Sequence, residues 1–86
     1  MKSFHLTVAT PDGNCFDGEC GELIVRGTEG ELAILAGHIP FVTSLVSSGC
    51  TLILPEGEEK RATIDGGVLT AGSEHVTLIA GSFKFI

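Results

Sequence analysis

Apolar and polar residues alternate at the start of the chain, where Phe4, Leu6 and Val8 are separated by single polar residues. Successive side chains of a β-strand point to opposite faces, so a period of two is typical of a strand with one buried face. The alternation therefore predicts an opening strand over residues 3–9.

Glycine and proline interrupt the rest of the chain at short intervals. The 12 glycines and 3 prolines run from Pro11 to Gly81, and no later interval between them exceeds eight residues. An average α-helix has about 11–12 residues, so no helix of ordinary length fits. The intervals instead predict strands over residues 14–17, 21–27, 31–35, 41–46, 50–54, 60–65, 67–71 and 75–80.

Short strands at this spacing predict an all-β fold, a two-sheet, mostly antiparallel β-sandwich of about nine to ten short strands. The pair Gly66-Gly67 predicts a bend or bulge where one strand crosses between the sheets. The apolar tail over residues 83–86 is expected to pack onto the sandwich. The predicted core consists of Phe4, Leu6, Val8, Leu23, Val25, Leu32, Ile34, Leu52, Leu54, Ile64, Val68, Val76 and Leu78.

Length and charge narrow the classes of protein that the chain can represent. A chain of 86 residues buries only ~60% of its unfolded surface, which predicts a single domain over residues 1–86 with one small core. A net charge of −6 with five basic residues argues against a nucleic-acid partner and against an anionic lipid surface. No apolar run approaches the ~20 residues that span a bilayer, so membrane association is expected only through another protein.

The three cysteines, Cys15, Cys20 and Cys50, leave at least one thiol unpaired, as in a reducing compartment. Three arrangements are open for them: free thiols that behave as small apolar residues, a Cys15–Cys20 bridge, or a metal site completed by a histidine. The Cys-x4-Cys spacing differs from the short spacing of zinc knuckles, so free thiols and no metal are expected.

Sequence patterns of catalysis are absent. The chain has no glycine-rich phosphate loop with a following Lys and Ser/Thr, and no Gly-x-Ser-x-Gly turn. His5, His38 and His75 lie on separate segments, and the polar strand positions of His5 and His75 favour solvated surface side chains. No catalytic residue and no cofactor is predicted.

The segment GTEGELAILAGHIP, from Gly27 to Pro40, is the most informative part of the chain. It predicts a hairpin tip over residues 27–30, a short apolar strand and a Gly-His-x-Pro turn, since glycine permits positive φ and proline fixes φ. This segment resembles the epsilon subunit of F-type ATP synthases, which carries Gly-Ser/Thr-Glu-Gly-Glu-Leu followed by Gly-His-Ala-Pro at this spacing.

The resemblance spans nearly the whole chain. It includes the opening strand, Phe16-Asp17-Gly18, the Gly66-Gly67 pair with the apolar residues after it, and Val76-Thr77-Leu78-Ile79-Ala80. Three positions depart from the family pattern: Ala36 replaces a usual proline, Ala33 a frequent glycine and Ile39 a smaller alanine.

The resemblance implies a non-catalytic rotor subunit that links the gamma subunit to the c-ring and couples ion translocation to ATP synthesis. It implies a peripheral place at the cytoplasmic face of the bacterial inner membrane, reached only through the complex, and a monomeric isolated domain. The implied c-ring contacts are Glu29, Gly30 and Glu31, and the implied gamma contacts are His38, Phe41, Val42 and Thr43.

Two alternatives to these contacts and this function stay open from the residues alone. The tip could be merely solvated and the histidine turn satisfied by nearby backbone. The chain could also be an independent β-sandwich module that binds another protein or a carbohydrate. Most members of the resembled family continue into two helices that inhibit ATP hydrolysis and in some members bind ATP. This sequence stops at Ile86, as a short subunit or as a piece, and is expected neither to bind ATP nor to inhibit hydrolysis.

Overall fold

The computed structural model describes residues 2–37 and 40–86, which form ten strands and no helix. Within these residues, nothing forms a helix that could cross a membrane. The strands are β1 (Phe4–Thr10), β2 (Gly13–Cys20), β3 (Glu22–Gly27), β4 (Gly30–Leu35), β5 (Phe41–Leu45), β6 (Ser48–Ile53), β7 (Glu59–Ile64), β8 (Gly67–Ala71), β9 (His75–Ile79) and β10 (Phe83–Phe85).

Every strand predicted from the sequence is present, which confirms the all-β class. The largest difference is in β2, which continues to Cys20 although only residues 14–17 were expected. The apolar tail forms β10, which pairs antiparallel with β7. The tail is thus held by backbone hydrogen bonds as well as by packing.

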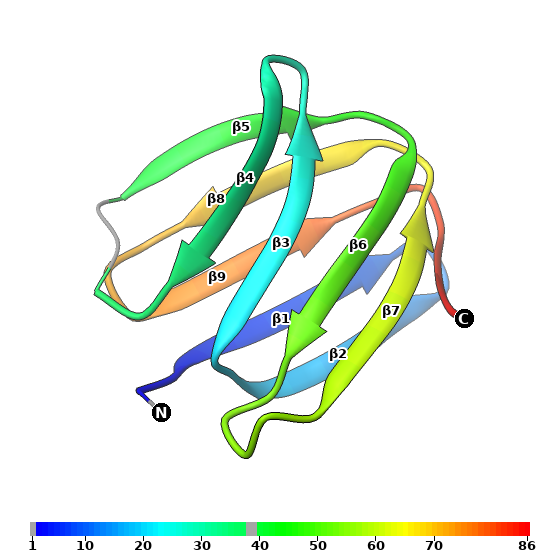
Figure 1. The fold of residues 1–86 in the computed structure, drawn as a ribbon. Helices are drawn as coiled ribbons and strands as arrows, with labels where there is room; N and C mark the ends of the chain where they lie inside the picture. Colours follow the sequence, from blue (N-terminus) through cyan, green and yellow to red (C-terminus); the bar gives the residue numbers. More distant parts are fainter. Residues whose placement is uncertain (1, 38–39) are drawn as a thin grey trace.

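The strands form two layers around the core (Figure 1). In this view β4, β3, β6 and β7 lie in front, and β5, β8, β9, β1 and β2 lie behind them. One hydrogen-bonded path, β10-β7-β6-β3-β5-β8-β9-β1-β2, runs through both layers, and β4 attaches to β3. All pairs are antiparallel except β1 with β9. The mostly antiparallel sandwich is confirmed, and its layers join along one side like a partly closed barrel.

The two layers join at one corner. There Leu45 of β5 pairs with Gly27 of β3 and also with Gly67 of β8. The Val46 amide next to this pair donates to the Arg26 carbonyl at 3.1 Å, which ties β5 to β3. We call Gly27, Leu45 and Gly67 the corner residues.

Gly67 is the most constrained residue of the corner. Its φ is +149°, and a Cβ added there would lie 2.3 Å from the carbonyl oxygen of Ile79 and 3.1 Å from the Cα atom of Ala80. Both distances are well inside van der Waals contact, so only glycine lets β8 approach β9 this closely.

The glycine pair also explains an error in the predicted core. Continuing the alternation from the buried Ile64 would place Val68 inside, but Val68 is 43% exposed and Leu69 is fully buried. Gly66 and Gly67 both have positive φ and together shift the alternation by one residue, and such a shift moves every following side chain to the other face. The predicted bend is therefore present, and it reverses the faces of β8.

The other predicted core residues are buried except Leu32 and Leu54, which are half-buried. Leu54 lies in the β6–β7 turn, where its amide donates to the Glu58 carbonyl at 2.8 Å, and Leu32 lies at the groove described below. The buried apolar residues that the alternation had not included are Cys20, Leu45, Cys50, Ala62, Leu69, Ala71, Ala80 and Phe83.

Gly67→Ala tests the corner. The methyl group cannot fit against the Ile79 carbonyl, so we expect a loss of about 2 kcal/mol or more and a melting temperature lower by roughly 10 °C. Gly49→Ala in β6 is the matched control, because its added Cβ meets only the Ala62 carbonyl oxygen, at an ordinary 3.7 Å. Equal melting temperatures for the two variants would contradict this account.

Candidate functional site between strands β4 and β5

The β3–β4 hairpin ends in a tight turn of Thr28 and Glu29, closed by the pair Gly27 and Gly30. Gly30 has a φ of +127°, a conformation that L side chains rarely adopt. The Thr28 amide donates to the Ser44 carbonyl of β5 at 3.2 Å, so the turn is fastened to the neighbouring strand. The hairpin tip predicted over residues 27–30 is present and held in place.

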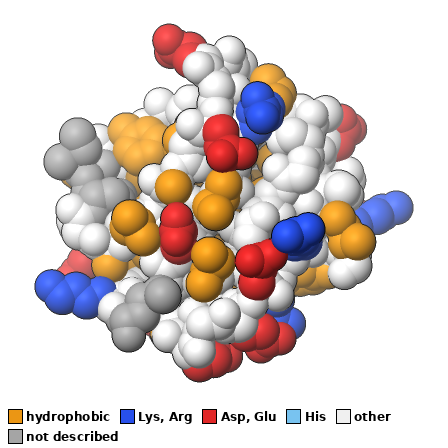
Figure 2. All heavy atoms as spheres, viewed as in Figure 1, with side chains coloured by type: hydrophobic (Ala, Val, Ile, Leu, Met, Phe, Trp, Pro, Cys, Tyr) orange, Lys and Arg blue, Asp and Glu red, His pale blue; other side chains and the backbone are white. Residues whose placement is uncertain are grey.

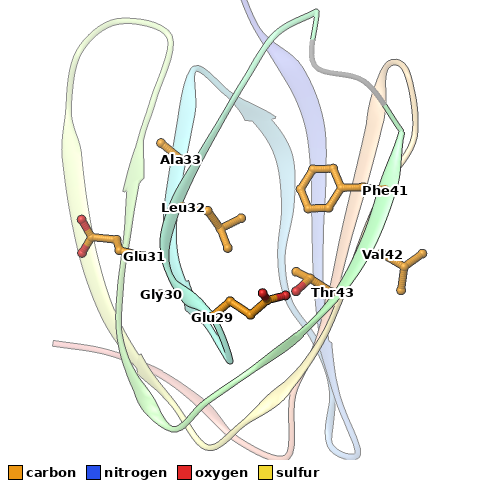
Figure 3. Close-up of a pocket in the computed structure, with 9 residues that line it drawn as sticks. Glu29, Gly30, Glu31, Leu32, Ala33, Phe41, Val42 and Thr43 are labelled. Carbon is orange, nitrogen blue, oxygen red and sulfur yellow. The ribbon is translucent and has the colours of Figure 1, made fainter.

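A groove lies beside this tip, between β4 and β5, which share no ladder in the described part of the chain. Its volume is about 450 Å³. Figure 3 shows Leu32 and Phe41 pointing into the space between the two strands, with the Glu29 carboxylate turned toward Thr43. The residues that line the groove are Gly27, Glu29, Gly30, Glu31, Leu32, Ala33, Phe41, Val42 and Thr43.

Strand alternation divides the side chains around the groove into inner and outer ones. On β5, Phe41 and Thr43 are half-buried, whereas Val42 points outward and is 68% exposed. On β4, Leu32 points inward and Glu31 outward. The groove therefore has an apolar floor, and the carboxylates of Glu29 and Glu31 form an acidic rim beside it. Glu31 and Val42 point away from the floor, on the outer sides of β4 and β5.

The rim carboxylates are available to a partner. Glu29 and Glu31 are exposed, and the described residues offer neither of them an ion pair or hydrogen bond. Arg26 lies opposite Glu31 in the β3–β4 ladder, but no ion pair joins the two side chains. Figure 2 shows acidic side chains and a basic one at the top of the view, where the β3–β4 hairpin lies in Figure 1.

Six of the seven predicted contact residues thus surround one groove. The seventh, His38, lies outside the described residues. The sequence analysis missed that Leu32 belongs to the groove floor as much as to the core. The sequence held one signal for this position of Leu32: the short interval between Leu32 and Phe41, which brings the two apolar strands β4 and β5 to opposite sides of the groove.

No group of three or more His, Cys, Asp or Glu side chains within residues 2–37 and 40–86 is arranged to hold a metal ion. All three cysteines are free, so the alternative of a Cys15–Cys20 bridge is wrong. Cys15 is exposed, whereas the Cys20 thiol is buried and donates to the Glu22 carbonyl at 3.1 Å. Burial raises the pKa of the Cys20 thiol, and burial beside Cys20 raises the pKa of Cys50 to about 11.

Comparison with known proteins gives a consistent set of relatives. The sequence model of the family described as "ATP synthase, Delta/Epsilon chain, beta-sandwich domain" matches residues 3–85. The ATP synthase epsilon chains of Caldanaerobacter subterraneus and Clostridium novyi are each 36% identical over 98% of this chain. A sodium-ion-specific ATP synthase epsilon chain of Acetobacterium woodii is 32% identical over 98% of this chain.

The alignments cover only part of these relatives. The chain spans 61% of the Caldanaerobacter protein and 64% of the Clostridium protein. Among solved structures, a chain of the Euglena gracilis mitochondrial ATP synthase matches 96% of this chain with a TM-score of 0.92 at 21% identity, with 53% of that chain covered. A chain of the Tetrahymena thermophila enzyme's central stalk and c-ring matches 95% of this chain with a TM-score of 0.78 at 10% identity, with 66% of it covered. The two structures share the fold.

Thiol labelling tests the burial of the cysteines. At about pH 8 a thiol with a pKa of about 11 is only roughly one part in a thousand thiolate, so Cys50 should react very slowly with a disulfide reagent. We expect one fast thiol per native chain, three in denaturant, and none fast in native Cys15→Ser. Two fast native thiols would show that Cys20 or Cys50 is accessible.

Proposed function

Because the chain belongs to the beta-sandwich domain family of the ATP synthase Delta/Epsilon chain, we propose that it acts as a non-catalytic central-stalk subunit of an F-type ATP synthase. In this role it links the gamma subunit to the c-ring, as one domain, and helps to couple ion translocation to ATP synthesis. The observation that carries the proposal is the groove between β4 and β5, where an unpaired acidic tip and an apolar floor lie side by side.

The acidic tip is the part proposed to meet the c-ring. Glu29, Gly30 and Glu31 lie at the end of a hairpin, and hairpin ends reach the loops of a partner without moving the sheet. The carboxylates of Glu29 and Glu31 are exposed, so they can pair with polar or basic groups of the ring's loops. Contacts between exposed charges contribute little affinity but favour one orientation over another.

The strand on the other side of the groove is proposed to meet gamma. Phe41 and Thr43 point into the groove, and Val42 offers an apolar side chain on the outer side of β5. Half-buried aromatic residues beside a groove are typical anchors of a stable protein interface. A gamma segment that contacts all three must cover both the groove and the outer side of β5.

The same proposal sets the location. The curated relatives are ATP synthase subunits of bacteria, which suggests a complex at the cytoplasmic face of the inner membrane, with this chain held there by its protein partners. One relative is sodium-specific, and nothing in the groove distinguishes a proton-coupled from a sodium-coupled complex.

Reversal of charge at the tip tests the c-ring contact. In the reconstituted complex, Glu31→Lys should lower proton or sodium pumping per ATP hydrolysed, because a repelled or misplaced tip weakens coupling. Glu56→Lys makes the same charge change in the β6–β7 turn, at the other end of the molecule in Figure 1, and should leave pumping unchanged. An exposed charge alters stability by only about 0.5 kcal/mol, so both variants should fold. Equal pumping by the two variants would exclude a c-ring contact at Glu31.

Truncation of the groove floor tests the gamma contact. Phe41→Ala should weaken gamma binding about tenfold or more, which is the loss of about 1.4 kcal/mol expected for an aromatic anchor. Ile79→Ala is the control, since Ile79 is 54% exposed on β9, away from the groove. Binding is measured by titration of gamma against each variant, with melting curves to check the fold. Unchanged gamma affinity of Phe41→Ala would remove Phe41 from the interface.

A further inference from the structure

A second polar cluster lies on the outer face of the rear layer, across β2, β1 and β9. The ladders place His5 opposite Glu19 of β2 and also opposite His75 of β9, and Thr7 opposite Asp17. All five side chains occupy the alternate positions that point away from the core. The sequence analysis expected His5 and His75 to be solvated separately, but the strand pairing brings them together.

Each ring nitrogen of His5 faces a carboxylate of the edge strand β2. His5 Nε2 lies 2.5 Å from Asp17 Oδ1, and His5 Nδ1 lies 3.4 Å from Glu19 Oε2. A neutral imidazole has one N–H and one acceptor nitrogen, so it can donate to only one of these carboxylates, and its lone pair would face the other. The imidazolium carries an N–H on both nitrogens, so it donates to Asp17 and attracts Glu19 through its charge at ion-pair distance. The geometry therefore fits the charged ring.

The hydroxyl groups next to His5 donate to the same two carboxylates. Ser3 Oγ donates to Glu19 Oε1 at 2.7 Å, and Thr7 Oγ1 lies 3.5 Å from Asp17 Oδ1. Since the Thr7 hydroxyl has one hydrogen, a Thr7 that donates to Asp17 accepts from His75 Nε2 at 3.1 Å. The hydroxyl groups of Ser3 and Thr7 and the His75 ring can donate these hydrogen bonds without a change of charge. His5 is the member whose second donor depends on a bound proton.

Strand β2 is an edge strand that is held to β1 by a backbone ladder and by this contact. Among the described residues it pairs only with β1, and its first three residues, Gly13–Cys15, are exposed. Toward the core, β2 contributes the half-buried Phe16 and the buried Cys20. Its side-chain contacts with β1 and the residue before β1 are those of Asp17 and Glu19 with His5, Ser3 and Thr7, and that of Cys15 Sγ with Thr10 Oγ1 at 3.8 Å.

We propose that a proton on His5 fastens edge strand β2 to β1, so that β2 loosens when the pH rises and His5 loses that proton. The groups that face His5 are Asp17 and Glu19 from β2 and the His75 ring from β9, at a centroid distance of 4.9 Å. Glu74, before β9, accepts the His5 amide through its backbone carbonyl. The device is separate from the groove between β4 and β5.

The direction of the pH effect follows from the partners of His5. The hydrogen bond to Asp17, with the negative charges of Asp17 and Glu19, raises the pKa of His5 above its ordinary value of 6.5. A raised pKa in the folded state contributes stability that is complete below 6.5 and is lost as the pH rises through the folded value. The contact is thus made in mildly acidic solution and lost in alkaline solution.

Amide hydrogen exchange, followed residue by residue by NMR, tests the proposal. After correction for intrinsic exchange, protection of the β2 amides relative to those of β7 should fall by roughly threefold or more between about pH 6 and pH 9. The His5 ring, followed in the same samples, should titrate with the same midpoint as the loss of protection.

Three variants separate this device from general effects of pH. His5→Gln should abolish the pH dependence of β2 protection, and Asp17→Asn should bring the pKa of His5 back toward 6.5. His75→Gln removes the ring that faces His5 at a centroid distance of 4.9 Å and that contacts Thr7 but no carboxylate, so it should leave a pH dependence in place with a shifted midpoint. Protection of β2 that does not change with pH in the unaltered protein, or a pH dependence that persists in His5→Gln, would overturn the proposal.

Discussion

Where the two layers join, the backbones of β3, β5 and β8 meet through Leu45, with Gly27 on one side and Gly67 on the other. Gly67 must be glycine for steric reasons, because a Cβ there would meet the β9 backbone, whereas a Cβ on Gly27 would lie 3.1 Å from the Leu32 side chain and would require that side chain to shift by a few tenths of an ångström. The corner therefore fixes the angle between the layers. It also positions the candidate groove, since Gly27 begins the acidic tip, and β5 forms the opposite wall as it leads into Leu45.

The sequence was sufficient for the parts of the fold that depend on local pattern. Period-two alternation located the first strand and most of the core, and the intervals between glycines and prolines located the other strands and the turns. The exposure of Val68 could not be predicted this way, because the alternation reverses inside a glycine pair whose geometry depends on β5 and β9. The resemblance indicated six residues of the groove, but the outward direction of Val42 and the part played by Leu32 required the strand register. The His5 cluster also required the β1–β9 pairing, which joins nearly opposite ends of the chain.

The negative charge of the chain is held in two different ways. Asp17 and Glu19 each contact His5 or a hydroxyl group, so their charge contributes to the packing of neighbouring strands. Glu29 and Glu31 have no such partner among the described residues, and their charge faces solvent at a hairpin end. Net charge alone does not distinguish these cases. Only the first kind is coupled to the stability of the fold, and only the second is free to meet another protein.

The parallel pairing of β1 with β9 has a consequence for synthesis on the ribosome. β1 emerges first, but its neighbour on one side is β9, almost the last strand to be made. Until β9 has left the exit tunnel, one edge of β1 lacks its partner, and the apolar face of β1, with Phe4, Leu6 and Val8, belongs to an incomplete rear layer. Long-range pairings of this kind form slowly, and unpaired strands with one apolar face are prone to aggregate. A nascent chain interrupted before residue 75 would therefore be a natural client of chaperones.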